Sequence, residues 1–216
     1  ANWVKYFEKN NIPAVITDSN SGKGIREVIK KIHTVSAETK EKSAQKGRAG
    51  RSIRVLVLGI PNVGKSSFIN RISKKTSAKV GNKPGVTKAQ QIIRVDKDFE
   101  LFDTPGVLEP KFTDINKAMN VALCGSIKME ILPLDDLFIH AIGYLAKHYP
   151  EKLKERYNLT IDLDSDWVLP VYDHISDYRH IKKLRGETDY DRVQETFFND
   201  LKNASLGRIT WELSDE

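Results

Sequence analysis

The sequence contains a single cysteine, Cys124, and no long apolar run. One cysteine excludes a disulfide within the chain and is typical of proteins from a reducing compartment. No apolar stretch approaches the roughly 20 residues that cross a bilayer as a helix, and the polar and aromatic first residues do not resemble a secretory signal. We therefore expect a cytoplasmic protein, or one of an organellar matrix if the source is eukaryotic.

Negative charge is scarce in the first half of the chain. Residues 1–111 carry 22 Lys and Arg against 10 Asp and Glu, whereas residues 112–216 carry 13 against 19. A positive surface attracts polyanions, so these counts favour an RNA partner near the first half. Lysine-rich surfaces also keep proteins in solution, and the charge pattern alone leaves both interpretations open.

Short apolar segments and helical patterns alternate in this half, which indicates an α/β sheet domain. The periodicities predict helices at residues 2–9, 25–35 and 66–72. They predict strands at residues 13–17, 53–58, 91–95 and 99–102. The strand at 53–58 is almost wholly apolar, so we expect it to be central and buried on both faces. Residues 36–52 are rich in Lys, Arg, Gly and Ala, and predict a helix tail followed by a flexible basic linker.

After Pro110 the pattern becomes helical. Residues 134–148 carry apolar side chains at helical spacing, and residues 188–206 predict another helix, capped by Thr188 and ended by Gly207. We therefore expect a nucleotide-binding domain over residues 1–112 and an α-helical domain over residues 113–216.

Residues 59–66 read GIPNVGKS and match the P-loop pattern G-x-x-x-x-G-K-[ST] between a predicted strand and a predicted helix. Backbone N–H groups in such a turn form a nest for phosphate, and the helix N-terminus adds positive potential. We expect Lys65 to lie between the β- and γ-phosphates, Ser66 to bind Mg²⁺ and Ser67 to reach the α-phosphate. The residues predicted to contact the nucleotide here are Asn62, Val63, Gly64, Lys65, Ser66 and Ser67.

A second motif, Asp103-Thr104-Pro105-Gly106, follows a predicted strand at the distance of the D-x-x-G switch of GTPases. We expect Asp103 to hold Mg²⁺ through water and the Gly106 N–H to sense the γ-phosphate. Thr87 lies in the loop between the two motifs. Such a threonine is often an ordinary loop residue, but this position favours a Mg²⁺ ligand that binds only when the γ-phosphate is present. Lys65, Thr87 and Gly106 are thus the predicted catalytic residues.

The N-K-x-D motif that reads guanine is absent after Gly106, because the nearest match, residues 116–119 (NKAM), lacks the aspartate. Upstream, residues 14–25 read AVITDSNSGKGI, the strand–turn–helix pattern of the second guanine-contacting loop. We expect Asp18 and Ser19 to contact GTP there. Because this loop precedes the P-loop, the motif order is rotated, and the N-K-x-D loop is expected before residue 1.

With its motifs in this order, the chain resembles the YlqF/RbgA family of circularly permuted GTPases, which assist assembly of the large ribosomal subunit. The likeness rests on the P-loop and on residues 81–87 (GNKPGVT), 101–107 (LFDTPGV), 125–128 (GSIK) and 148–157 (HYPEKLKERY). It implies a P-loop GTPase fold that lacks its first part here, and a helical domain that contacts rRNA of the subunit precursor. It also implies that Asn62 helps to hold K⁺ beside the phosphates. The alternative is that Asn62 only stabilises the turn of the loop.

Val107 stands near the place where Ras-like enzymes have the glutamine that orients water. Valine makes no side-chain hydrogen bond, so we expect slow intrinsic GTP hydrolysis that ribosomal particles stimulate. Two alternatives stay open: an RNA-binding scaffold indifferent to nucleotide, and a small-molecule P-loop kinase. The second is disfavoured because the acidic tail offers no recognisable lid arginines or acceptor base.

Overall fold

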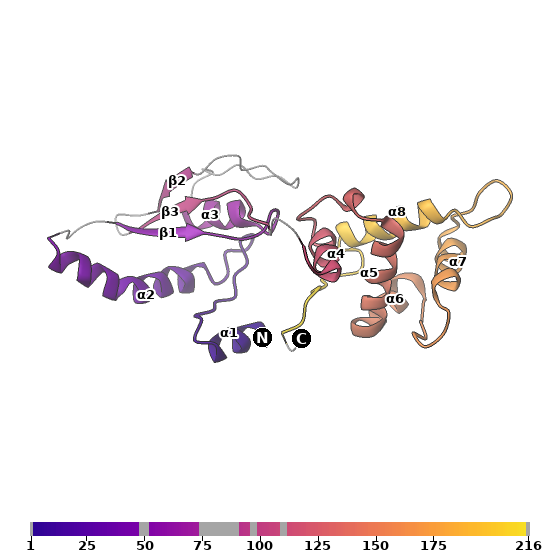
Figure 1. The fold of residues 1–216 in the computed structure, drawn as a ribbon, viewed down its shortest axis with the longest axis horizontal. Helices are drawn as coiled ribbons and strands as arrows, with labels where there is room; N and C mark the ends of the chain where they lie inside the picture. The colour runs from indigo at the N-terminus through magenta and orange to yellow at the C-terminus, as the bar shows by residue number, and fades with distance from the viewer. Residues whose placement is uncertain (1, 48–51, 74–90, 96–98, 109–111, 215–216) are drawn as a thin grey trace. The chain divides into compact units, whose positions relative to one another are not determined.

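The computed structural model describes residues 2–47, 52–73, 91–95, 99–108 and 112–214 (Figure 1). Contacts between residues divide the chain into two compact units, Ala1–Pro110 with Leu213–Glu216, and Lys111–Glu212. Each unit has its own apolar core. Among the described residues, no helix is both long and apolar enough to cross a membrane.

A three-stranded sheet forms the centre of the first unit. Strand β1 (Ile53–Val57) pairs in parallel with β3 (Phe99–Asp103), and β3 pairs antiparallel with β2 (Gln91–Arg94). The predictions of strands at 91–95 and 99–102 are confirmed to within one residue. The register places Val57 opposite Asp103, so the carboxyl ends of the two parallel strands meet at one edge of the sheet.

Helices α1 (Asn2–Lys9), α2 (Ile25–Gln45) and α3 (Lys65–Ser73) belong to the same unit. Apolar residues of α2 and α3 pack against the inward side chains of the strands, because their stripes recur at helical spacing. The buried members of this core are Ile25, Ile69, Ile72, Ile93, Phe99 and Leu101. The sheet is thus covered by α2 and α3 on the face that carries the core.

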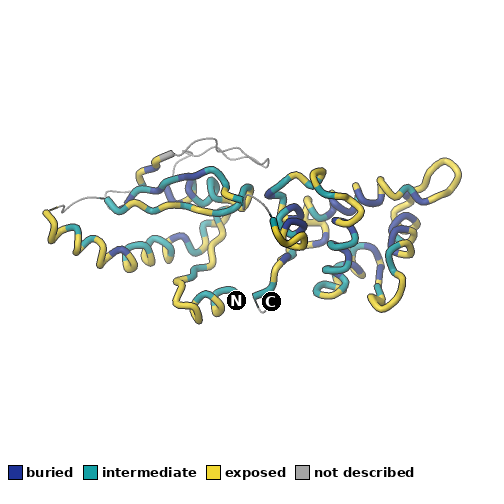
Figure 2. The backbone as a smooth tube through the Cα atoms, in the orientation of Figure 1, coloured by how far each residue is buried: buried dark blue, intermediate teal, exposed yellow. Residues whose placement is uncertain are grey.

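Two predictions about the strands were wrong: the segment 13–17 is no strand, and the strand at 53–58, which is present as β1, is not buried on both faces. Residues 13–17 contain no strand and pair with none of the described strands. Strand β1 is an edge strand of the described sheet, and its Arg54 and Leu56 are exposed while the alternate side chains pack against the core. Figure 2 shows β1 in the colours of exposed and intermediate residues. An apolar run is buried on both faces only where packed elements cover both, and the described helices supply one cover.

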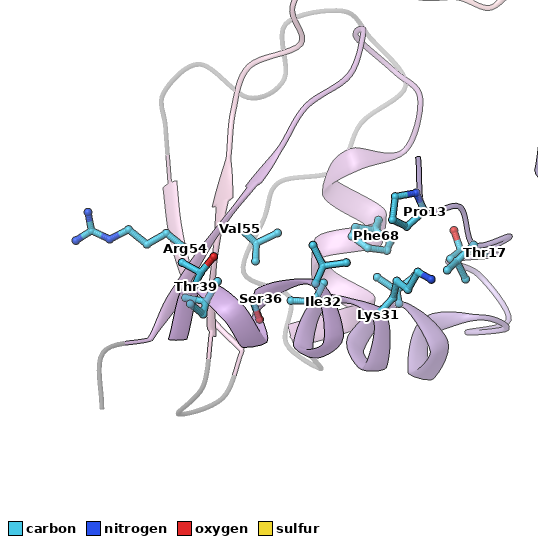
Figure 3. A pocket seen from close by; sticks show the side chains of 13 residues that line it. Pro13, Thr17, Lys31, Ile32, Ser36, Thr39, Arg54, Val55 and Phe68 are labelled. Atoms are coloured by element: carbon cyan, nitrogen blue, oxygen red, sulfur yellow. The ribbon is translucent and has the colours of Figure 1, made fainter. Parts of the chain in front are cut away.

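A hollow of about 660 Å³ lies beside β1, lined by β1, α2, residues of the 13–17 segment and α3. Figure 3 shows Pro13, Ile32 and Phe68 among its lining side chains. No residue from Gly59 to Ser67 lines it, so this largely apolar hollow is separate from the predicted phosphate site.

The helix tail predicted at the start of residues 36–52 is confirmed, because α2 continues to Gln45. Its last turns are rich in Lys, Glu, Ala and Gln, which favour helix over linker. Lys42 and Glu38 also form an i,i+4 ion pair of 2.5 Å on the exposed surface. Residues 48–51 of the predicted linker lie outside the described residues.

The second unit is helical throughout its described elements. These are α4 (Ile115–Leu123), the 3-10 helix η1 (Met129–Ile131), α5 (Leu134–His148), α6 (Pro150–Tyr157), α7 (Val168–Arg179) and α8 (Tyr190–Lys202). The predicted helix at 134–148 is confirmed. Its Phe138 stacks on Tyr172 at 4.3 Å between ring centroids and meets Phe197 edge to face, so aromatic rings fill the centre of this core.

The predicted helix at 188–206 is shorter in the structure. It is capped by Asp189, whose side chain accepts a hydrogen bond from the Arg192 N–H, and it ends at Lys202. Thr188, the expected cap, instead donates from its hydroxyl to Asp173 at 2.5 Å. A carboxylate one residue later in the chain therefore takes the capping role, since it accepts a stronger bond than a neutral hydroxyl.

Candidate nucleotide-binding site

The P-loop turns sharply from β1 into α3. Asn62 and Gly64 have φ values of 60° and 92°, in the left-handed region that Asn and Gly tolerate. The Phe68 N–H then donates to the Gly64 carbonyl at 2.8 Å, which closes the first turn of α3. Helix α3 therefore begins at Lys65, and its N-terminal N–H groups face the same loop that the pattern predicts to hold phosphate.

The Lys65 side chain folds back over this loop. Its Nζ donates to the carbonyls of Gly59 at 3.0 Å and Ile60 at 2.8 Å. Burial lowers the pKa of Lys65, and the nearby charge of Asp103 opposes that shift. A cation is thus held at the turn by neutral carbonyls, which are weaker acceptors than phosphate oxygens.

Asp103, at the carboxyl end of β3, is fully buried at 0% exposure. Within the described residues, neither of its carboxylate oxygens receives a hydrogen bond of normal geometry. Burial raises the pKa of Asp103, while the charge of Lys65 and the hydroxyl of Ser66 lower it. A buried carboxylate without donors is costly unless a cation neutralises it.

The Ser66 hydroxyl and the Asp103 carboxylate lie close together and supply oxygen ligands that fit Mg²⁺. The ion prefers carboxylate and hydroxyl oxygens, and commonly takes one or two from the protein with the rest from phosphate and water. Among the described residues, no group of three His, Cys, Asp or Glu could hold a metal alone. The donors Ser66 and Asp103 therefore suit an ion that is shared with a bound phosphate.

The D-x-x-G segment is fastened directly to the P-loop. The Val107 N–H donates to the Gly59 carbonyl at 3.1 Å, and the Thr104 hydroxyl donates to the Val57 carbonyl at 2.8 Å. A Cβ placed on Gly106 would lie 2.6 Å from the backbone nitrogen of Pro61. Glycine at position 106 is thus required by a close backbone approach, and it brings the predicted γ-phosphate sensor against the phosphate loop.

The predicted base-contacting turn is also formed, although the strand expected before it is not. The Asp18 carboxylate accepts hydrogen bonds from the N–H groups of Asn20 at 2.8 Å and Ser21 at 3.3 Å, as in an Asx turn. Gly24 has a φ of 79°, and a Cβ there would clash with the Ile16 carbonyl oxygen. Glycine therefore lets this turn enter α2.

A family model described as a 50S ribosome-binding GTPase matches residues 54–187. Ribosome biogenesis GTPase A of Bacillus cereus is 41% identical over 214 residues, which cover 99% of this chain and 72% of that protein. The chain belongs to the YlqF/RbgA family of GTPases. The resemblance inferred from the motifs is confirmed.

Two further comparisons place the chain within the fold of this YlqF/RbgA family. Ribosome biogenesis GTPase A of Thermotoga maritima is 25% identical over 214 residues, covering 99% of this chain and 70% of that protein. The GNP-bound crystal structure of YlqF from T. maritima aligns with 100% of this chain and 75% of that one, with a TM-score of 0.62 at 21% identity. The predicted fold class, a P-loop GTPase domain with a helical part, is confirmed.

The structure brings together only some of the predicted site residues of this YlqF/RbgA chain. Lys65, Ser66, Asp103 and Gly106 meet at the P-loop, while Thr87 lies outside the described residues. Val63 and Gly64 are exposed on the loop, and Ser67 is half-buried in the first turn of α3. Asn62 is exposed and adopts the left-handed backbone of the turn, which is the structural role considered above.

Sequence reasoning missed two residues that organise the site. The Thr104 hydroxyl joins β3 to β1, and Arg71 of α3 donates from Nε to the Ser19 carbonyl at 2.7 Å and from Nη2 to the Asn20 carbonyl. A polar residue within a D-x-x-G motif and an arginine on an exposed helix position carry no local signal of such partners. Only the tertiary structure brings residues about fifty positions apart into hydrogen-bond contact.

Proposed function

We propose that this GTPase binds and hydrolyses GTP with Mg²⁺ and acts in late assembly of the large ribosomal subunit through contacts with rRNA. The observation that carries the proposal is the contact between the P-loop and the Asp103–Gly106 segment, with a buried carboxylate lacking hydrogen-bond donors of normal geometry beside Lys65. The names of the relatives, ribosome biogenesis GTPase A, support the ribosomal role.

Phosphate binding would use the main chain first. The N–H groups of residues 62–67 line the loop and the N-terminus of α3, where aligned peptide dipoles favour an anion. The Lys65 ammonium is already at the loop, held by two carbonyls. Because phosphate oxygens accept charge-assisted hydrogen bonds, we expect the ammonium to leave these carbonyls for the β- and γ-phosphates.

Magnesium would be held by Ser66 and Asp103, and by Thr87 when the γ-phosphate is bound. The ion supplies positive charge that stabilises the phosphoryl group as it is transferred. Asp103 is kept in place by β3 and needs no rearrangement to act as a ligand. The closeness of Gly106 to Pro61 supports a role of the Gly106 N–H in sensing a γ-phosphate that lies on the P-loop.

Hydrolysis by the chain alone would be slow. Val107 follows the sensor glycine, its backbone N–H is engaged with Gly59, and its apolar side chain is 59% exposed. It can neither orient a water molecule nor stabilise developing charge. Activating partners commonly raise such rates by about 10³- to 10⁵-fold, and we propose that ribosomal particles act in this way. We also propose that Asn62 helps to hold K⁺ beside the phosphates.

Division of labour between the domains completes the proposal. Residues 1–112 would read the nucleotide and residues 113–216 would contact the ribosome and its rRNA, in the cytoplasm. The basic surplus of residues 1–111 supports an additional contact of the first domain with RNA, because polyanions favour positive surfaces.

The proposal is tested by GTP affinity of the wild-type chain and of Lys65→Ala, with Lys117→Ala as a matched control. Lys117 is an exposed lysine of α4 within the rejected NKAM segment. Loss of one charge-assisted contact predicts roughly 10- to 100-fold weaker GTP binding for Lys65→Ala and no change for the control. Equal affinity of wild type and Lys65→Ala would refute the phosphate site.

A further inference from the structure

Helix α3 carries functional groups at both of its ends. Lys65 and Ser66 lie at its N-terminus, and Arg71 lies six residues after Lys65. At 1.5 Å per residue this spacing is about 9 Å along the helix axis, which is comparable to the separation between the phosphates and the base of a bound nucleotide. A single rigid element could therefore position groups for both parts of the ligand.

The Arg71 guanidinium occupies two neighbouring carbonyls of the 18–22 turn. Its Nε donates to the Ser19 carbonyl at 2.7 Å, and its Nη2 donates to the Asn20 carbonyl. The guanidinium also packs against Gly22, where an added Cβ would be in van der Waals contact with Nε at 3.5 Å. The planar fork of arginine makes such two-point contacts, whereas lysine offers a single ammonium. Arg71 thus fixes the turn against the helix that bears the P-loop residues.

The hydrogen bonds inside the turn leave a particular group free. The Asp18 carboxylate holds the N–H groups of Asn20 and Ser21, and the Gly22 N–H donates to the Asp18 carbonyl at 2.8 Å. Within the described part of the chain, the Ser19 N–H donates no hydrogen bond, whereas the N–H groups of Asn20, Ser21 and Gly22 all do. Since the carbonyls of Ser19 and Asn20 are engaged by Arg71, the turn offers a donor and suits an acceptor on its ligand.

We propose that Arg71 is a positioning residue for base selection, which holds the 18–22 turn so that the Ser19 N–H donates to the 6-oxo group of guanine. The inference rests on the proposed binding of GTP. An oxo group accepts this hydrogen bond, whereas the 6-amino group of adenine presents a donor and is rejected. Sites built on a hydrogen bond discriminate strongly when the ligand lacks the matching group.

The test compares GTP with 2-aminopurine riboside triphosphate, which lacks the 6-oxo group and the N1–H that accompanies it but keeps the 2-amino group and the purine ring. Affinities are measured for wild type, Arg71→Ala, Arg71→Lys and Arg26→Ala. Arg26 is an exposed arginine of α2 and serves as the control for loss of charge. We expect Arg71→Ala to weaken GTP binding roughly tenfold and leave the analogue unchanged, since one aimed hydrogen bond is lost. The GTP affinity of Arg71→Lys should lie between those of wild type and Arg71→Ala. The GTP affinity of Arg26→Ala should equal that of wild type.

The outcomes separate the two proposals. If wild type binds GTP and Arg71→Ala keeps the wild-type ratio of GTP to analogue affinity, the role of Arg71 is refuted and GTP binding stands. This includes the case in which Arg71→Ala binds both nucleotides more weakly by the same factor, because that result indicates a purely structural contact. If wild type itself fails to bind GTP, the proposed function fails first. Thermal unfolding of each variant establishes that the affinities refer to folded protein.

Discussion

Replacing Gly106 with alanine probes the contact on which the nucleotide site depends. The new Cβ would lie 2.6 Å from the Pro61 nitrogen, 2.7 Å from its Cα and 2.7 Å from its Cγ. Side-chain Cβ atoms do not approach backbone atoms so closely, and no rotamer change relieves a clash with the main chain. The Asp103–Val107 segment and the P-loop must therefore move apart.

The cost is the strain of that movement. Overpacking by one methyl group typically costs about 1–3 kcal/mol, and the hydrogen bonds of Val107 to Gly59 and Thr104 to Val57 oppose the shift. If the loops separate, the γ-phosphate sensor is displaced. Since about 1.4 kcal/mol corresponds to a tenfold change in binding, we expect GTP affinity to fall by roughly 5- to 150-fold.

Gly143→Ala is the matched control. A Cβ at Gly143 would have only ordinary contacts with Trp167, the nearest at 3.7 Å, and the residue lies within α5. Alanine is favoured over glycine inside a helix by about 1 kcal/mol, so this substitution should stabilise the protein. Thermal unfolding and titration with a non-hydrolysable GTP analogue measure both effects. Unchanged stability and unchanged analogue affinity in Gly106→Ala would refute the steric argument.

Three further predictions concern the charged groups. Burial raises the pKa of Asp103, so the folded state holds a proton on this carboxyl more tightly than the unfolded state does. The free energy of unfolding without Mg²⁺ should therefore fall as the pH rises from the ordinary pKa of an aspartate through the raised pKa of Asp103. Asp103→Asn should abolish this fall in stability, and it should also abolish the gain in GTP affinity that Mg²⁺ gives. If titration shows that Mg²⁺ still raises the GTP affinity of the variant, Asp103 is not the Mg²⁺ ligand. GTP turnover should be faster in K⁺ than in Na⁺, and Asn62→Ala should remove the difference; equal phosphate-release rates in the two salts for wild type would exclude the K⁺ role. In the helical unit, burial alone would raise the pKa of Asp200, but hydrogen bonds from Arg156 and Tyr157 more than offset it, so this pKa is lowered. Asp200→Asn should lose about 1.5–3 kcal/mol in urea denaturation at neutral pH and progressively less as acid protonates the wild-type carboxylate, whereas a loss independent of pH would indicate packing instead.

The sequence alone determined the parts of this protein that local chemistry dictates. The P-loop could be predicted because a phosphate nest needs Gly, Lys and Ser at fixed spacing between a strand and a helix. The helix at 134–148 could be predicted from its apolar period, and the family from the order of its motifs. These features depend on neighbours along the chain, which the sequence displays directly.

Tertiary structure decided the remainder. The apolar run at β1 looked buried on both faces, but exposure depends on what covers a strand, which no local pattern records. Thr188 looked like a helix cap, but the fold brings Asp173 within reach of its hydroxyl, and the neighbouring Asp189 caps the helix instead. Three features of the site depend on residues that are distant in sequence. They are the burial of Asp103, the closeness of Gly106 to Pro61 and the hydrogen bond from Arg71 to the Ser19 carbonyl. Such contacts form only when the chain folds, because their geometry is set by strand register and helix packing and not by the residues themselves.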